Sequence, residues 1–523
     1  MSIPTWSYDA SFYDEKTRGT NVLIKTDLVK GKGLFASRAL KAGSIALEET
    51  AMCCTQNRDD YLKNVPVCGH CLVSVETPRA NVARVTRNKT LAMEIPYSAA
   101  FRARGHVRCR YVEQGCPMVF CSTRCQEAAW ASFHYANCRG CMNDASQAAY
   151  DQFISNDWEQ GGVDYSDTHF LSMRFLASAV TLRRLHKASL EASYAHIAQL
   201  IKAPITKFHF TFLLRDDDAF PTGTTDSVKE RVLWDQFQAF KGAEHGHPHV
   251  AQAEASSCTK DDMLTSGQAL IATVFQLSEE EKEFYLGTRW SELLGAVLLN
   301  GQERTPHSPY YEHFQALASI PSVEQEIRAY HKKVKTLGYN ASKLHCSSSG
   351  QGIYTIGCLF NHSCDPNLQV LYIDGNDETL VAVCLRDVQE GEELCISYIN
   401  ESLPYAERQQ QLYEHYLFDC GCKKCSGEAE SATKAIAAVD VPAGVTAVSQ
   451  PPPAVVSSDT DTDADDTAPV GVIGTSMPTV AEDVPLVVSA TGVDAGVSLE
   501  QPEKIQASEA HTIDVKEESA APS

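Results

Sequence analysis

Two stretches of the chain alternate short apolar runs with glycine-containing turns, which is the pattern of short β-strands. The first covers residues 21–49, where Val22-Leu-Ile-Lys is followed by Gly31-Lys32-Gly33 and then by Leu34-Phe35-Ala36. The second covers residues 350–400, with apolar runs beginning at Val370, Thr379 and Leu394. We therefore predict small sheets built from two segments that lie far apart in the sequence.

Helical periodicity dominates the region between these stretches. Residues 165–340 read mostly as helix, and Phe175, Ala179, Leu182 and Leu185 recur on one helical face. Ser278 with an acidic residue three positions later, at Glu281, predicts a capping box that opens a helix. A further short helix is expected over residues 404–418. Strand-rich ends around a helical middle indicate an α+β fold.

Cysteines are numerous and occur at metal-ligand spacing. The chain has 19 cysteines, and within residues 68–141 several of them recur with one histidine. The ligand candidates there are Cys68, Cys71, Cys109, Cys116, Cys121, Cys125, His134 and Cys138. Eight ligands are enough for two tetrahedral zinc ions, and we favour zinc over scattered core cysteines because the spacing is so regular. A second group, Cys420-x-Cys422-x2-Cys425, follows near residue 420.

Charge is distributed unevenly along the chain. Residues 427–523 hold 17 Asp and Glu against 3 Lys and Arg, out of a net charge of −22 for the whole protein. That segment is rich in Ala, Val, Pro, Ser, Thr and Asp, and it should be disordered because it has too little apolar surface to offset the entropy of ordering. The remaining body is mildly acidic, which suits a basic partner and argues against nucleic-acid binding over the whole surface.

The N-terminal residues lack the basic and apolar regions of a signal peptide, and no apolar run approaches the length of a membrane span. We therefore expect an intracellular, reduced protein, in the nucleus, the cytoplasm or both, whose cysteines bind zinc rather than form disulfides. We expect no membrane partner and a monomer.

The most specific motif is Asn361-His362-Ser363-Cys364-Asp365-Pro366-Asn367, which is followed about thirty residues later by Ser397-Tyr398 and then by the last cysteine group. This ordered set resembles the SET domain of protein lysine methyltransferases. Together with the early cysteine-rich segment it resembles the SET–MYND class, and in particular its Set-five-like branch. The resemblance implies a β-rich SET fold in which the segment after Asn361 and His362 passes under a loop, a path rare among folds.

The same resemblance assigns the early cysteines to a MYND zinc finger with interleaved sites. Cys68, Cys71, Cys121 and Cys125 would hold one zinc, and Cys109, Cys116, His134 and Cys138 would hold the other. Six residues separate Cys109 from Cys116, whereas the family usually has two at this place. Cys141 is therefore an alternative to Cys109 as the eighth ligand.

Site roles are also implied by the resemblance. Tyr398 matches the catalytic tyrosine, and Asn361 and His362 match the pair that binds S-adenosylmethionine. The further residues that match cofactor-binding positions are Lys30, Gly31, Lys32, Gly33, Asn300, Tyr416 and Phe418. Cys364 would complete a third zinc site with Cys420, Cys422 and Cys425.

The chemistry explains why such residues are needed. A lysine amine has a pKa of about 10.4, so making it neutral near pH 7 costs roughly 4–5 kcal/mol. A dry channel that disfavours the ammonium removes part of this cost, and alignment of the two reactants can supply about 7–11 kcal/mol more. The predicted reaction is methyl transfer from S-adenosylmethionine to a protein lysine, with a histone tail as the leading substrate.

The predicted organisation follows the motifs. It comprises the N-terminal part of the SET domain (1–67), a MYND-like finger (68–141), a helical insert (142–340), the catalytic part of the SET domain (341–403), a post-SET zinc segment (404–427) and a disordered acidic tail (428–523).

Three alternatives are weighed against this interpretation. An inert SET–MYND adaptor could bind proline-containing peptides through its finger, and a cross-brace zinc ubiquitin ligase would explain the finger but not the C-terminal motif. The segment from Arg79 to Arg110 has a charge of +7 and could touch nucleic-acid phosphates. We favour a solvated flexible loop there, because aromatic residues do not alternate with the cations.

Overall fold

The computed structural model describes residues 7–27, 30–101, 105–160, 163–208, 220–242, 260–318, 320–346, 348–372, 379–443 and residue 445. Residues 1–478 form one compact unit and residues 479–523 another. All the described residues belong to the first unit, and the predicted disorder of residues 446–523 lies outside the described residues.

A four-stranded sheet joins the two ends of the catalytic part, in the order β1-β2-β14-β11. Its strands are β1 (Val22–Asp27), β2 (Gly31–Ala36), β14 (Glu393–Ile396) and β11 (Asn361–His362). Strand β2 pairs antiparallel with both β1 and β14, whereas β11 runs parallel to β14. The sheet therefore places the glycine-rich segment and the Asn-His motif on either side of β14.

Two three-stranded sheets complete this part, in the orders β12-β13-β3 and β4-β10-β9. Their strands are β3 (Ile45–Thr50), β4 (Cys53–Gln56), β9 (Gln302–Arg304), β10 (Gly350–Ile353), β12 (Leu368–Tyr372) and β13 (Thr379–Cys384). Helix α1 (Ala10–Thr17) packs beside them, and Tyr13 joins Leu34, Phe360 and Leu394 in one apolar core. The strands predicted at residues 21–49 and 350–400 are confirmed.

The helical middle of the chain shares one large apolar core with the cysteine-rich segment. It contains α7 (Asp144–Ser155), α8 (Ser166–Arg184), α9 (Leu190–Ala198), α12 (Lys260–Val274), α13 (Glu279–Tyr285) and α14 (Thr288–Asn300), and a small hairpin of β7 (Glu159–Gln160) and β8 (Val163–Asp164). Helix α8 is buried over most of its length, as its apolar face predicts. The capping box at Ser278 and Glu281 is confirmed, with both reciprocal hydrogen bonds present.

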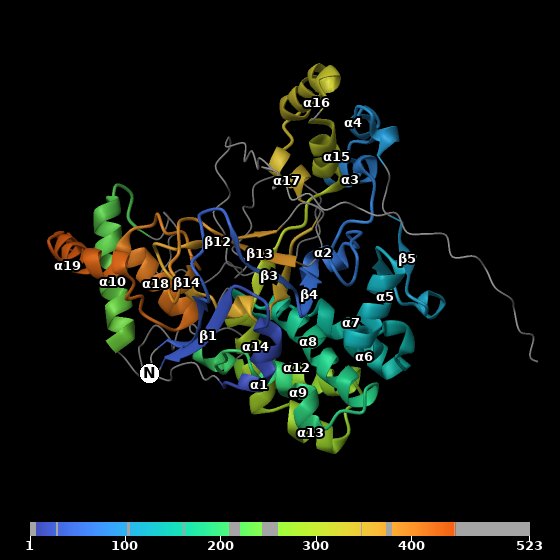
Figure 1. The fold of residues 1–523 in the computed structure, drawn as a ribbon, viewed down its shortest axis with the longest axis horizontal. Coiled ribbons are helices and arrows are strands. Elements are labelled where there is room, and N and C mark those ends of the chain that lie inside the picture. The colour runs from blue at the N-terminus through green and yellow to red at the C-terminus, as the bar shows by residue number, and fades with distance from the viewer. Residues whose placement is uncertain are drawn as a thin grey trace, which may run out of the picture. The chain divides into compact units, whose positions relative to one another are not determined.

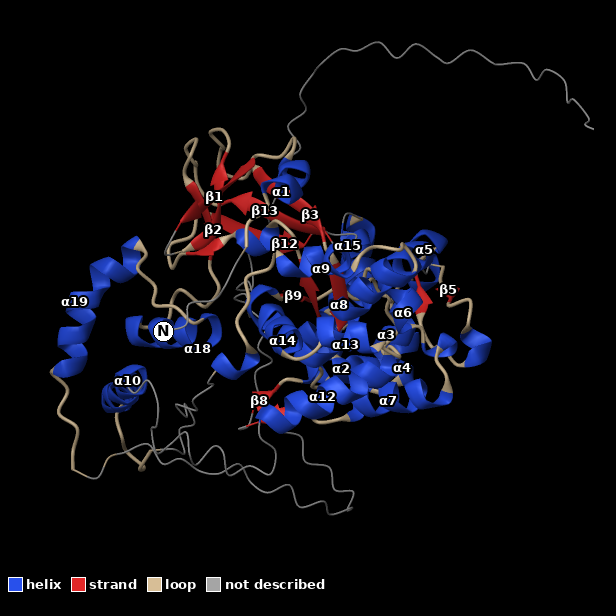
Figure 2. Ribbon diagram, turned by 90° about the horizontal axis from the view of Figure 1, so that it is seen from below, coloured by secondary structure: helices blue, strands red, loops and turns tan. Residues whose placement is uncertain are grey.

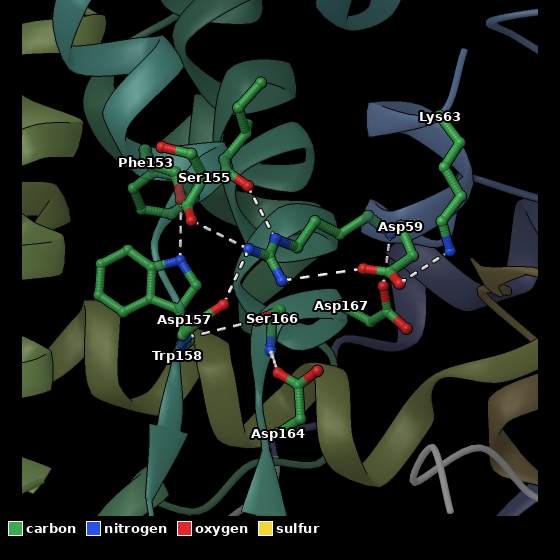
Figure 3. Close-up of polar contacts among 11 residues, drawn as sticks. Asp59, Lys63, Phe153, Ser155, Asp157, Trp158, Asp164, Ser166 and Asp167 are labelled. Atoms are coloured by element: carbon green, nitrogen blue, oxygen red, sulfur yellow. Dashed lines mark hydrogen bonds and ion pairs between the residues drawn. The ribbon is translucent and has the colours of Figure 1, made fainter. Parts of the chain in front are cut away.

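Arg58, which follows β4, ties that sheet to the helical region through polar contacts with Ser155, Asp157 and Asp167, three residues that are labelled in the close-up of Figure 3. It opens helix α2 (Arg58–Leu62), where its backbone N–H donates to Asp167 of α8 over 2.6 Å. Its guanidinium donates to the carbonyls of Ile154 and Ser155 at the end of α7. Burial raises the pKa of Asp167 to about 6, although the hydrogen bond from Arg58 opposes that shift.

The cysteine-rich segment forms a finger that packs against this helical core. It contains the hairpin β5 (Val107–Arg108) and β6 (Val119–Phe120), then α5 (Thr123–Ala129), a π-helical turn (Trp130–His134) and α6 (Tyr135–Asn137). Arg174 of α8 attaches this finger to the body. Its buried guanidinium donates to the carbonyls of Cys54 and Gly69 and lies over the ring of Phe133.

The basic segment inside the finger is folded, and the prediction of a solvated flexible loop is wrong for its described residues. It forms α3 (Pro78–Thr86) and α4 (Lys89–Met93), which lie beside α15 (Pro309–Ala318), α16 (Glu324–Thr336) and α17 (Ala341–His345) in Figure 1. Val82 and Leu91 from the first pair pack with Tyr310, Phe314 and Leu344 from the second group. These partners are more than 200 residues away in the sequence, so local composition could not reveal the packing. We call the described residues of the ranges 77–101 and 309–345, which contain these five helices, the inserted lobe.

The C-terminal helices surround the last cysteine group. Helix α18 (Tyr405–Tyr416) confirms the helix expected at residues 404–418, and α10 (Asp226–Gly242) and α19 (Lys423–Ala437) lie beside it in Figure 2. The rings of Trp234 on α10 and Tyr405 on α18 contact each other, with their centroids 6.0 Å apart. The acidic tail was predicted to begin at residue 428, but α19 continues to Ala437.

The α+β fold class is confirmed, with helices and small sheets in one unit and three cysteine-rich clusters. Within the described residues no helix has the length and apolar character that a bilayer crossing requires.

The buried His169 and the half-buried His196 should make stability depend on pH. Burial lowers the pKa of His169 and of His196 to about 4, whereas an unfolded histidine titrates near 6.5. The unfolded chain therefore gains protons first, and stability should fall as the pH drops from about 6.5 towards 4, by about 1.4 kcal/mol per histidine and pH unit.

The replacement His169→Phe tests this, because the ring can keep its stacking on Trp158, whose centroid is 4.3 Å away. We expect a smaller loss of thermal unfolding temperature between about pH 7 and about pH 5 than in the unmodified protein. An equal loss in both proteins would contradict the assignment.

Candidate functional site

The parallel pairing of β11 with β14 forms the centre of the site. Asn361 lies opposite Cys395 and His362 opposite Ile396, and the Ser363 N–H donates to the Ile396 carbonyl over 2.9 Å. Tyr398 follows β14 directly. The two motifs that the sequence separates by about thirty residues are therefore neighbours.

Two hydrogen bonds fix Tyr398 against the Asn-His strand. Its backbone N–H donates to Nδ1 of His362 over 3.0 Å, and its hydroxyl donates to the carbonyl oxygen of Phe360. Burial lowers the pKa of His362 to about 4 and raises the pKa of Tyr398 well above its usual value. Near pH 7 both side chains are therefore uncharged, and the Tyr398 hydroxyl keeps its proton.

Aromatic rings surround Tyr398. The Tyr416 ring lies 4.7 Å from the Tyr398 ring, and the Phe418 ring lies 6.5 Å from Tyr398 and 6.2 Å from His362. Leu417 between them has a left-handed backbone, with φ of 62°, which ends α18 and turns the chain. The rings that precede and follow this turn thus both lie beside Tyr398, and together they form an apolar wall of the site.

A polar contact between Asn361 of β11 and Glu393 of β14 lies close to Gly33 of β2. The Asn361 amide donates to Glu393 over 2.9 Å, and Lys30 pairs with the same carboxylate over 2.7 Å. A Cβ atom on Gly33 would lie only 2.6 Å from the Asn361 amide nitrogen. The absence of a side chain on Gly33 therefore leaves room for the Asn361 amide beside β2.

The side chain of Lys32 turns to another part of the protein. It is fully buried, and its ammonium donates to the Tyr13 hydroxyl over 2.8 Å and to the carbonyls of Ser7 and Gln199. Burial lowers its pKa to about 8. Only the backbone of Lys32 remains beside Gly31 and Gly33 in β2, and its side chain anchors α1 and the end of α9 beneath that strand.

Asn300 ends helix α14 and is buried. Its amide donates to the carbonyls of Ile201 and Ala296, over 2.6 and 2.7 Å, and its Oδ1 has no donor among the described residues. A buried amide oxygen without a donor is unusual in native proteins. It leaves one acceptor free for a ligand, and the cofactor role of Asn300 stays a prediction.

Glu49 was not predicted as a site residue from the sequence. Its carboxylate accepts hydrogen bonds from three successive backbone N–H groups, those of Thr355, Ile356 and Gly357, over 2.7–3.0 Å. These residues lead directly into Phe360 and Asn361. Glu49 thus positions the start of the Asn-His strand from β3, and the only sequence signal was an acidic residue within a strand.

The finger brings eight ligand atoms together in two groups of four. One consists of Cys68, Cys71, Cys121 and Cys125, and the other of Cys109, Cys116, His134 and Cys138, with all atoms of a group within 4.8 Å of one another. The Cys109 sulfur lies 3.2 Å from His134 Nε2, whereas Cys141 is exposed. The π-helical turn at Trp130–His134 places that histidine, and such turns often occur at functional sites.

Cys364, Cys420, Cys422 and Cys425 form the third group. Arg408 of α18 is almost fully buried beside it and donates to the Cys425 sulfur over 3.6 Å. The His362 ring nitrogen Nε2 lies 3.1 Å from the Cys364 sulfur. This group therefore adjoins the Asn-His strand directly. Arg408 was not expected from the sequence, because a buried arginine in a polar helix has no local signature.

All three groups suit zinc. Thiolate and imidazole donors are its usual ligands, and tetrahedral Zn–S bonds of about 2.3 Å place sulfurs about 3.8 Å apart. The measured sulfur–sulfur distances of 3.7 Å (Cys71–Cys121), 3.5 Å (Cys121–Cys125) and 3.5 Å (Cys364–Cys425) are close to that value. The roles of individual ligands stay predictions.

Comparison with known proteins gives the family. The SET domain matches residues 31–399, which is more than half of the chain. This chain belongs to the SET domain family. It is 24% identical to the chicken (Gallus gallus) protein-lysine N-trimethyltransferase SMYD5 over 413 residues, which is 77% of this chain and 84% of that protein.

Two further relatives agree with this. The histone-lysine N-methyltransferase ATXR2 of Arabidopsis thaliana is 26% identical over 376 residues, covering 71% of this chain and 72% of its own. The SET domain and MYND-type zinc finger protein 6 of Schizosaccharomyces pombe is 43% identical over 95 residues, covering 18% and 19%. Together with the cysteine clusters, these similarities show that the chain is a protein lysine methyltransferase of the SET–MYND class. This outcome favours the enzyme over the inert adaptor.

Zinc analysis of the purified protein should find three ions per chain, one for each group. We expect Cys109→Ser and Cys364→Ser to leave two ions each, because a tetrahedral site loses most of its affinity with one ligand. Cys141→Ser is the matched control and should keep three. Loss of an ion in the Cys141 variant, with three retained in the Cys109 variant, would exchange the two assignments.

Proposed function

We propose that this SET–MYND protein transfers a methyl group from S-adenosylmethionine to a lysine ε-amine, with histone tails as substrates. The observation that carries the proposal is the meeting of Asn361 and His362 with Tyr398 on the paired strands β11 and β14. The reaction requires an aligned channel and polar atoms around a cationic methyl donor. Tyr398 lines the channel, and Asn361 and His362 supply polar atoms.

The residues present fit the cofactor. Bound S-adenosylmethionine would supply the electrophilic methyl group on its sulfonium. Gly33 leaves the backbone of β2 open beside the Asn361 amide, and the Asn300 Oδ1 is a buried acceptor without a donor among the described residues. Gly31, Gly33, Asn361, His362 and Asn300 would hold it, with Lys30 and Glu393 at the edge.

The aromatic wall supports the binding of the lysine substrate as a neutral amine. Tyr398, Tyr416 and Phe418 exclude water from the place where the amine must enter, and His362 adds no charge because burial keeps its pKa low. A lysine ammonium loses hydration there, so its pKa falls and the neutral amine becomes easier to form. The proton leaves to solvent before the amine is enclosed.

The Tyr398 hydroxyl orients the amine but does not remove its proton. Its own proton is held by the Phe360 carbonyl, and burial raises the pKa of Tyr398 well above its usual value, so the phenolate is not formed near pH 7. The Tyr398 oxygen can therefore only accept a hydrogen bond from the amine, through a lone pair that lies beside the Phe360 carbonyl. These two oxygens offer the amine and the methyl group a fixed polar edge within an apolar surrounding.

Histone tails are proposed as substrates on two grounds. The relative from Arabidopsis thaliana is named a histone-lysine N-methyltransferase, and the chain has a net charge of −22, which attracts basic peptides. Attraction of this kind raises the association rate and weakens with salt.

Replacing Tyr398 by Phe should reduce methyl transfer to histones by about a hundredfold, which is typical for loss of one oriented polar group in an active site. Binding of S-adenosylmethionine, measured by calorimetry, should change little, because the ring and its packing remain. Tyr97→Phe, on the inserted lobe, is the control and should keep full activity. Equal transfer by the Tyr398 variant and the unmodified protein would remove Tyr398 from the mechanism.

Gly33→Ala should weaken cofactor binding. The added methyl group would meet the Asn361 amide nitrogen at 2.6 Å and displace the Asn361 side chain from its present position. We expect the dissociation constant for S-adenosylmethionine to rise by about tenfold or more. Gly427→Ala is the control, since a Cβ there meets nothing within 4 Å. Unchanged cofactor affinity in the Gly33 variant would place the cofactor elsewhere.

A further inference from the structure

The inserted lobe contains a cavity that the methyl-transfer site does not use. It has a volume of about 470 Å³ and lies between α15 and α16. Tyr310, Tyr311 and Phe314 of α15 contribute aromatic rings, and Ile327 and His331 of α16 line the opposite side. Its size and lining match pockets that take a large apolar side chain or a small ligand.

The cavity carries little charge of its own near pH 7. Burial lowers the pKa of His331 and of His345, and the neighbouring histidines lower these pKa values further. Glu324 and Arg328, which also line the cavity, form an ion pair with each other. The interior is thus suited to an uncharged, aromatic or aliphatic group.

The surface beside the cavity is basic, in contrast with the acidic chain as a whole. Residues 77–101 and 309–345, which form the lobe, contain nine Lys and Arg against four Asp and Glu, whereas the protein has a net charge of −22. Lys332 and Lys335 are exposed on α16 and form no ion pair with any residue in the described part of the chain. They follow Arg328 and His331 by four positions each, so they continue the helix face that lines the cavity.

The helix α16 is anchored to the rest of the lobe on the side away from Lys332 and Lys335. On that side the Tyr330 hydroxyl donates to the Leu91 carbonyl of α4 over 3.1 Å, and Lys333 pairs with Glu94. Tyr330 and Val334 are buried in the core of the lobe. The cavity and the two lysines therefore keep one relative placement.

We propose that this face of the inserted lobe binds an acidic peptide segment of a partner protein, with one aromatic or large aliphatic residue in the cavity and carboxylates on Lys332 and Lys335. An acidic segment matches the local charge, and its apolar anchor matches the aromatic lining. Nucleic acid would use the lysines but has no need of an apolar cavity at this place. The site lies outside the methyl-transfer centre and does not depend on its assignment.

Fluorescence anisotropy on the full-length protein tests the proposal. The probe is a short fluorescein-labelled peptide with one tryptophan flanked by glutamates. We expect saturable binding that weakens with salt, and about tenfold weaker binding for the double variant Lys332→Glu/Lys335→Glu. Ala318→Trp, which fills the mouth of the cavity from α15, should weaken it to a similar degree.

Matched controls separate the site from general charge and folding effects. The double variant Lys187→Glu/Lys207→Glu carries the same charge change on exposed residues elsewhere, and Ala316→Trp adds the same ring to α15 at a residue that does not line the cavity. Both should bind within about twofold of the unmodified protein. Circular dichroism should show the same unfolding temperature for all four variants, and a lowered temperature for Ala318→Trp would leave the lysine variant to decide.

Three results would overturn the proposal. The first is absence of saturable binding by the unmodified protein. The second is displacement of the peptide by a DNA duplex together with insensitivity to Ala318→Trp, which would identify a surface for nucleic acid. The third is a change of sedimentation in the lysine variant that shows the face to be an interface between two copies of this chain.

Discussion

The parallel contact between β11 and β14 is the constraint on which the site depends. Only two residue pairs form it, yet it brings together two segments that are separated by β12 and β13. So short a pairing cannot be stable alone, and hydrogen bonds from three neighbouring groups stabilise it. Glu49 holds the backbone before it, the amide of Asn361 is bound by Glu393, and the Tyr398 N–H is bound by His362.

The third cysteine group supports this contact from the remaining side. The apolar core around it is small, with Ile399 and Leu412 packed among Cys364, Cys420 and Cys425. A core of this size contributes little stability by burial alone, so metal binding would supply most of the folding free energy of the segment. Metal binding by Cys364 and the last three cysteines would then also hold the rings of Tyr416 and Phe418 in position.

The sequence carried most of the local information about this fold. The strands at both ends, the capping box at Ser278 and the ligand spacing of the cysteines follow from short-range patterns, and the structure has them where they were predicted. The site's central residues belonged to a motif whose spacing is itself informative. What could not be predicted are the contacts between distant segments. Glu49, Arg408 and the side chain of Lys32 owe their roles to partners that only folding brings near.

The inserted lobe illustrates the same limit and has a consequence of its own. One of its halves interrupts the zinc finger and the other interrupts the catalytic domain, and each half covers the apolar face of the other. Either half alone would leave that apolar face exposed to water. The shared packing thus adds a further link between the finger and the catalytic domain, beside Arg174 and the apolar core around α8, and a ligand that separates the two halves of the lobe would expose apolar surface on both segments.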